Sequence, residues 1–207
     1  MSTNNADIDY FQVENRLFPV SHTLLERHLP SSWAVLTQGR LRHRTASSPQ
    51  YPTFLPNVTA LEFGALVKVI HGFWRADEDE RAEFYMEWEE WQALLALAFR
   101  WRIARVHEIA VLHLYDDFPP EEAEALLVQG STCGVPTERM VGPACELALS
   151  GCETLASGTP AIRTLYYSVR VTYLDYLAQR QRSRGSVSDQ DKRVLAMQAA
   201  KAVFGLN

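Results

Sequence analysis

The sequence predicts an α+β fold, a small sheet covered by helices and followed by an all-helical extension. Three observations lead to this prediction. An alternating hairpin pattern occupies residues 7–20, a short extended segment follows at 51–55, and the apolar residues after position 58 repeat at helical spacing. We therefore expect a sheet-containing domain over residues 1–117 and a helical extension, packed on it, over residues 118–207.

The first element is a hairpin of two short strands. Apolar, β-branched and aromatic residues over 8–13 and 17–20 predict the strands, and residues 14–16 supply the turn. Pro19 lacks a backbone N–H, so its strand should lie at an edge of the sheet or its nitrogen should face away from the neighbouring strand. Ser21 is a suitable N-cap for a short helix that follows.

A second short helix, an irregular loop and a third strand should come next. Residues 31–36 favour the helix, and residues 39–50 are basic and rich in serine without apolar periodicity, as in a solvated loop. Residues 51–55 should then add a strand to the sheet. Thr59 and Glu62 form a capping box ahead of a helical apolar stripe, which predicts a helix start there.

An acidic segment separates this helix from the next pair. The carboxylates of residues 76–87 repel one another, so we expect a surface loop. Apolar stripes then predict one helix over 91–101 and another over 106–113, with a break near Arg102. We expect these two helices to pack against each other in antiparallel orientation.

The rest of the chain should be helical. Gly130 suits the C-cap of the first helix of this region, and the third helix should be the longest, reaching about Arg182. The helix starts are indicated by N-cap and N1 residues at Pro119-Pro120, Pro136, Thr159-Pro160 and Ser188 with Asp191.

Composition excludes several function classes. A net charge of −5 opposes wrapping around phosphate backbones, so we expect no direct nucleic-acid binding. The longest apolar stretches are far short of the roughly 20 residues that cross a bilayer. The polar, acidic start of the sequence has no signal-peptide pattern, which favours a cytoplasmic or nuclear location.

The charge is unevenly distributed along the sequence. Acidic residues crowd 77–90, while Lys and Arg enrich the C-terminal quarter. This asymmetry favours an electrostatic contact, within the chain or with a partner.

No pattern indicates catalysis, a cofactor or a metal. Histidine pairs such as His107 and His113 are six residues apart, so they do not share a helix face as zinc ligands do. The segment 130–134 lacks the preceding strand of a nucleophile elbow. The three cysteines are odd in number and unclustered, so we expect reduced thiols at Cys133, Cys145 and Cys152.

Three segments in order resemble the BTB/POZ fold, in the form typical of basidiomycete fungi. Residues 13–20 resemble that family's second-strand region, and Val58 with residues 61–66 resembles its valine-to-phenylalanine helix. Residues 91–98 with Trp101 are similar to its tryptophan-alanine-tryptophan helix. The resemblance covers roughly residues 7–180 and implies a non-enzymatic protein–protein interaction module.

The resemblance also implies kinds of partner and a surface. The partner would be a second copy of the chain or another protein, such as a cullin-type ubiquitin ligase scaffold or a transcriptional partner. In a homodimer the interface would be the hairpin and the first helix, with candidate residues Ile8, Tyr10, Leu17, Phe18, Leu24 and Leu25.

Two other classes of function stay open at this point. The helical extension could hold a small molecule, or act as an enzyme, in a pocket lined by aromatic residues. The candidate lining residues are Trp101, Tyr166, Tyr167 and Tyr173. A purely structural oligomer would instead have a large symmetric apolar interface.

Overall fold

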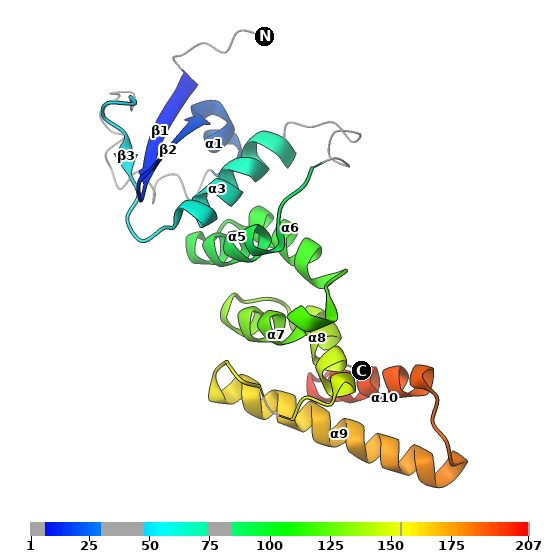
Figure 1. Ribbon diagram of the computed structural model, residues 1–207. Helices are drawn as coiled ribbons and strands as arrows, with labels where there is room; N and C mark the ends of the chain where they lie inside the picture. Colours follow the sequence, from blue (N-terminus) through cyan, green and yellow to red (C-terminus); the bar gives the residue numbers. More distant parts are fainter. Residues whose placement is uncertain (1–6, 30–47, 74–83, 154, 207) are drawn as a thin grey trace. The chain divides into compact units, whose positions relative to one another are not determined.

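The computed structural model describes residues 7–29, 48–73, 84–153 and 155–206 (Figure 1). It confirms the α+β class, since the described residues form eight α-helices and one three-stranded sheet. The chain divides into two compact units, residues 1–110 and residues 111–207. This division comes seven residues before the boundary that we expected after residue 117. The helix expected over 31–36, and most of the loop expected over 39–50, lie outside the described residues.

The sheet is built from the predicted hairpin and a short third strand. Its strand order is β2-β1-β3, with β1 antiparallel to β2 and parallel to β3. Glu14 has a φ of 54°, the left-handed conformation that a two-residue hairpin connection requires. Pro19 lies in β2 at the edge of the described sheet, as predicted. The bounds are β1, Ile8–Val13; β2, Arg16–Ser21; and β3, Thr53–Phe54.

The core of the first unit forms between the sheet and α3. Phe11, Val13 and Val20 are buried on one face of the sheet. The ring of Phe63, on α3, packs against Phe11 and against Phe18, with centroids 5.4 and 5.3 Å apart. The helical elements of this unit are α1, His22–His28; α3, Ala60–Lys68; a π-helical segment η3, Val69–Phe73; and α5, Trp88–Trp101.

Helix α5 packs along α3. It makes few contacts with the helix after it, α6 (Ala104–Tyr115), so the expected antiparallel pairing of α5 with α6 is wrong. The aromatic contact between Phe63 and Trp101, 6.3 Å between centroids, lies within the α3–α5 packing. The predicted break is confirmed, because Arg102 takes the left-handed conformation (φ 57°) that ends α5.

The second unit is helical, as predicted. Helix α8 packs against α7, and α10 lies along both α8 and α9 (Figure 1). Thr159 and Ser188 cap α9 and α10 through their side-chain oxygens, as their sequence context predicts. The bounds are η4, Pro120–Glu122; α7, Ala123–Thr132; α8, Thr137–Ser150; α9, Pro160–Arg184; and α10, Asp189–Val203.

Gly130 does not cap a helix, in contrast to the prediction. It lies inside α7, which continues to Thr132, and it is buried. A Cβ at this position would lie 2.7 Å from the hydroxyl of Tyr115 and 2.9 Å from the sulfur of Met140. Close packing, and not chain reversal, is the reason for a glycine here.

Candidate interaction surface

The face of the sheet that points away from α3 carries mainly apolar side chains. Side chains alternate between the faces of a strand, so the residues between the buried Asp9, Phe11 and Val13 point outward. The register places Leu17 and Phe54 beside Gln12 on this outward side. We call this surface the outer sheet face; it consists of Ile8, Tyr10, Gln12, Leu17, Pro19 and Phe54.

The outer sheet face combines exposure with a lack of charge. Leu17 is 44% exposed and Phe54 is 56% exposed, both large apolar side chains. None of its six residues is ionisable at neutral pH, and Gln12 alone has an amide side chain. An uncharged and apolar centre is the composition that distinguishes the middle of a protein interface from ordinary surface.

The structure divides the predicted interface residues into four groups. Ile8, Tyr10 and Leu17 lie on the outer sheet face, whereas Phe18 points to the opposite side and contacts Phe63. Leu24 is half-buried on α1. Leu25 is fully buried within the chain, so its prediction as an interface residue is wrong.

The error at Leu25 has a simple cause. Helix α1 packs against β2 and η3, and this packing buries the side of the helix that carries Leu25. The sequence also did not indicate Phe54 as a member of the surface. Its position depends on the parallel pairing of β3 with β1, which joins segments about forty residues apart.

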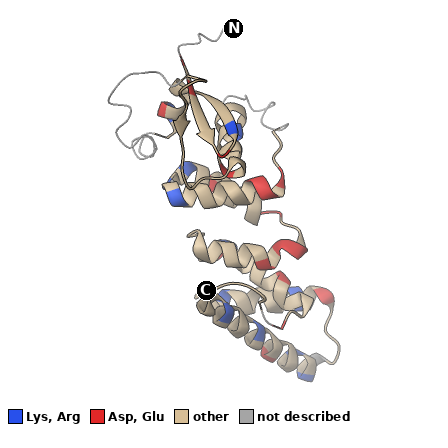
Figure 2. Cartoon of the chain, turned by 60° about the vertical axis from the view of Figure 1, so that its left-hand side comes forward, with Lys and Arg blue, Asp and Glu red and all other residues tan. Residues whose placement is uncertain are grey.

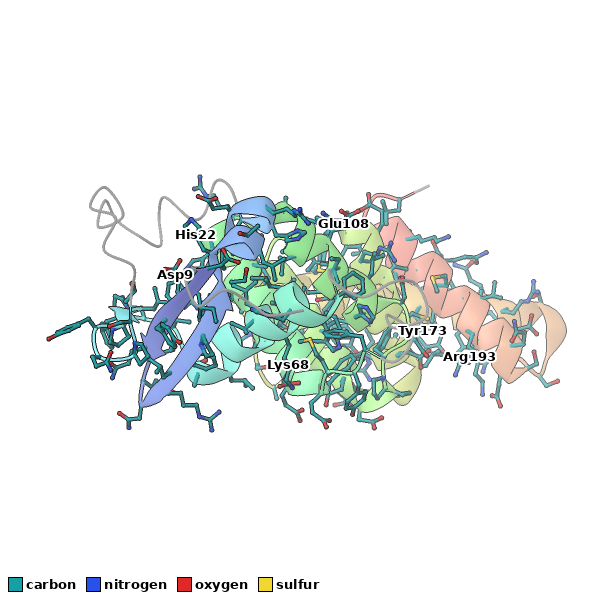
Figure 3. The ribbon with its side chains drawn as sticks, turned by 90° about the horizontal axis from the view of Figure 1, so that it is seen from above. Asp9, His22, Lys68, Glu108, Tyr173 and Arg193 are labelled. Carbon is teal, nitrogen blue, oxygen red and sulfur yellow. The ribbon has the colours of Figure 1, made fainter. Side chains whose placement is uncertain are left out.

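A cluster of polar side chains holds the start of α1 against the sheet (Figure 3). The His22 Nδ1 atom lies 2.9 Å from the carboxylate of Asp9, and its Nε2 atom lies 3.1 Å from that of Glu26. Partial burial lowers the pKa of His22, but the hydrogen bonds and negative charges of Asp9 and Glu26 outweigh burial. The pKa of His22 is therefore raised.

The neighbouring Ser21 does not form a nucleophile with this histidine. Its hydroxyl donates to Asp7 at 2.8 Å and accepts the backbone N–H of Leu24 as the N-cap of α1. Both nitrogens of His22 already face carboxylates, so the ring is not arranged to take a proton from Ser21. Hydrogen bonds from Thr23 and Ser21 lower the pKa of Asp7. The cluster fixes the position of α1.

The four aromatic residues predicted to line a pocket have different surroundings. The Tyr166 hydroxyl donates to the backbone oxygen of Cys152 at 2.7 Å, and burial raises the pKa of both Tyr166 and Tyr173. These two tyrosines fill the core of the second unit. Tyr167 is 59% exposed, and Trp101 belongs to the aromatic cluster around Phe63 in the first unit.

The second unit has a hollow elsewhere, along the last two helices. This α9–α10 groove has a volume of about 630 Å³ and opens to solvent. Its lining is mostly polar, with Leu195 as the aliphatic member. The lining residues are Tyr176, Gln179, Arg180, Ser183, Leu195 and Gln198.

The cysteines are free thiols, as predicted. Burial raises the pKa of Cys133, and it raises that of Cys145 to about 11, so both thiols are protonated at neutral pH. Within the described ranges, no three His, Cys, Asp or Glu side chains gather as ligands of a metal ion. No helix in the described part of the chain is long and apolar enough to cross a membrane.

Comparisons with known proteins found no relative of this chain. No family model matches it, and neither a curated protein nor a solved structure matches it. The class of the fold and the candidate surface therefore follow from the chain's own residues, and the resemblance to BTB/POZ proteins stays a prediction.

Proposed function

We propose that this chain is a non-enzymatic, BTB/POZ-like protein–protein interaction module. It binds a second copy of itself or serves as an adaptor for another protein, without forming or breaking covalent bonds. The proposal includes a cytoplasmic or nuclear location and needs no cofactor.

The outer sheet face is the observation that carries this proposal. Leu17 and Phe54 expose apolar area to water, and removing such area contributes roughly 25 cal/mol per Å² of association free energy. Leu17 and Phe54 lie on either side of Gln12, and exposed apolar side chains gathered on one face of a sheet favour a site of association.

The polar cluster at the start of α1, on the other side of β1 from the outer sheet face, supports the same proposal. Asp9, His22 and Glu26 are engaged with one another. They hold α1 against the sheet and so keep the outer sheet face in a fixed shape. A fixed surface loses less conformational entropy on binding than a mobile one.

A charge placed at Leu17 tests the proposal. Leu17→Asp would bury an unpaired carboxylate in the interface, so we expect at least about tenfold weaker association. Association with the chain itself is measured by light scattering over a concentration series. Association with other proteins is measured by capture from a lysate of the source organism followed by mass spectrometry.

Leu61→Asp is the matched control for this experiment. Leu61 is 47% exposed on α3, close to the exposure of Leu17, but it lies outside the outer sheet face. The control should keep the solution mass and the captured proteins of the wild type. Association that survives Leu17→Asp in a folded protein contradicts the proposed surface.

A further inference from the structure

The last two helices have a charge opposite to that of the rest of the chain. Residues 159–207 contain eight Lys and Arg residues and three Asp residues, a net charge of +5, whereas the whole chain has a net charge of −5. Lys and Arg positions, coloured blue in Figure 2, recur along α9 and α10. The α9–α10 groove lies within this basic region.

Arg180 supplies the positive charge of the groove lining. Its Nη2 atom lies 3.6 Å from the carboxylate of Asp191, in the first turn of α10. This ion pair engages one carboxylate, and a guanidinium carries five N–H donors. Arg180 therefore keeps the capacity to bind a further carboxylate in the groove.

The other lining residues match the chemistry of a peptide chain. The amides of Gln179 and Gln198 both donate and accept hydrogen bonds, as backbone N–H and C=O groups require. Tyr176 and Leu195 offer apolar area to side chains. A groove open to solvent along two helices suits an extended chain better than an enclosed small molecule.

We propose that the α9–α10 groove binds an acidic, extended peptide segment of a partner protein. Arg180 pairs with a carboxylate of the peptide, and Gln179 and Gln198 hydrogen-bond its backbone. The surrounding basic residues of α9 and α10 attract the acidic chain at longer range. This surface is separate from the outer sheet face, and its use is independent of the function proposed above.

The test uses the full chain and a synthetic acidic peptide. The probe is a fluorescein-labelled copy of residues 76–90, which contains eight acidic residues and one arginine. A control peptide replaces each Asp by Asn and each Glu by Gln, and so keeps the aromatic residues. Fluorescence anisotropy should show binding of the acidic probe and at least about tenfold weaker binding of the amide peptide.

Two arginine variants locate the binding. Arg180→Gln should weaken binding of the probe about tenfold. Arg163→Gln removes the same charge from α9 outside the groove lining and should change binding less than about twofold. Equal weakening by both variants would overturn the proposal, because it would indicate non-specific attraction to basic helices.

A third variant tests the groove independently, in case Arg180→Gln destabilises the fold. Ser183→Trp fills the groove without removing the Arg180–Asp191 pair, and it should weaken binding as Arg180→Gln does. Unchanged binding by Ser183→Trp, with circular dichroism of the wild type, overturns the proposal. Displacement of the probe by single-stranded RNA at equal charge concentration overturns it in favour of nucleic acid.

Discussion

At the scale of single residues, His22 shows how one side chain can make the fold depend on pH. The ring connects Asp9 on β1 to Glu26 on α1, and only the protonated ring carries N–H groups on both nitrogens to serve both carboxylates. Its pKa is raised in the folded state, so folding favours the charged form. The stabilisation is complete below the ordinary histidine pKa of about 6.5 and is lost as pH rises through the folded pKa.

We therefore expect His22→Gln to lose more stability at pH 6 than at pH 8. The midpoint of urea unfolding, followed by tryptophan fluorescence, measures the difference at each pH. Glu26→Gln should produce a smaller change of the same sign, because the Asp9 contact remains. An equal loss at both pH values would show that the ring acts only through packing.

Gly130 gives a second prediction at this scale. Gly130→Ala places a methyl group against the buried Tyr115 hydroxyl, which donates to the Leu126 oxygen at 2.7 Å. We expect overpacking to destabilise the second unit by about 1–3 kcal/mol. Gly64→Ala is the contrast, because its added Cβ would meet Phe18 at an ordinary 3.6 Å. That change should stabilise α3 by roughly 0.5–1 kcal/mol, since alanine favours helix.

Thermal unfolding followed by circular dichroism checks both glycine variants. A stable Gly130→Ala protein with the wild-type midpoint would show that Tyr115 and Met140 move aside without cost.

The sequence predicted residues whose role depends on their immediate neighbours. Ser21, Thr59, Thr159 and Ser188 all cap helices as expected, because a cap depends on a few consecutive residues. The prediction for Gly130 was wrong. This residue resembles a helix C-cap in sequence, but a glycine is needed because Tyr115 and Met140 pack closely against it. Such an approach depends on tertiary packing, which no local pattern encodes.

At the scale of elements, α3 and α5 are joined by a reciprocal arrangement at their ends. Glu62 accepts the backbone N–H of Thr59 at the start of α3 and also pairs with Arg100 in the last turn of α5, at 2.7 Å. Glu90 accepts the backbone N–H of Glu87 at the start of α5 and pairs with Lys68 in the last turn of α3. Each glutamate thus caps its own helix and binds the other one.

This arrangement predicts unequal effects for two substitutions. Glu62→Ala removes a capping interaction and an ion pair, so we expect a loss of about 1–2 kcal/mol. Arg100→Ala removes only an ion pair whose arginine is 45% exposed, so its loss should be below about 1 kcal/mol. Urea unfolding measures both free energies. Equal losses would mean that the cap contributes nothing measurable.

The sequence indicated both helices but not their pairing. The capping box of α3 and the apolar stripe of α5 were visible as local patterns. The partner of α5 was mistaken because adjacent helices were expected to pack together, whereas Phe63 and Trp101 bring α5 to α3. The sequence likewise predicted only part of the outer sheet face. Phe54 was missed because it belongs to this face through the parallel pairing of β3 with β1.

At the scale of the whole molecule, the two units can be followed by different signals. All five tryptophans lie within residues 1–110, so tryptophan fluorescence reports the first unit alone. Far-ultraviolet circular dichroism reports the helices of both. Gly130→Ala should therefore shift the dichroism transition and leave the fluorescence midpoint within error. A common shift of both signals would show that the two units unfold together.

We have proposed that the outer sheet face binds another protein. The most direct measurement is photo-cross-linking with benzoylphenylalanine placed at position 17 or at position 61, in the organism's own lysate and with the purified chain. We expect cross-links to a partner chain from position 17 and none above background from position 61. No cross-link from position 17, or equal cross-linking from both positions, would contradict this proposal.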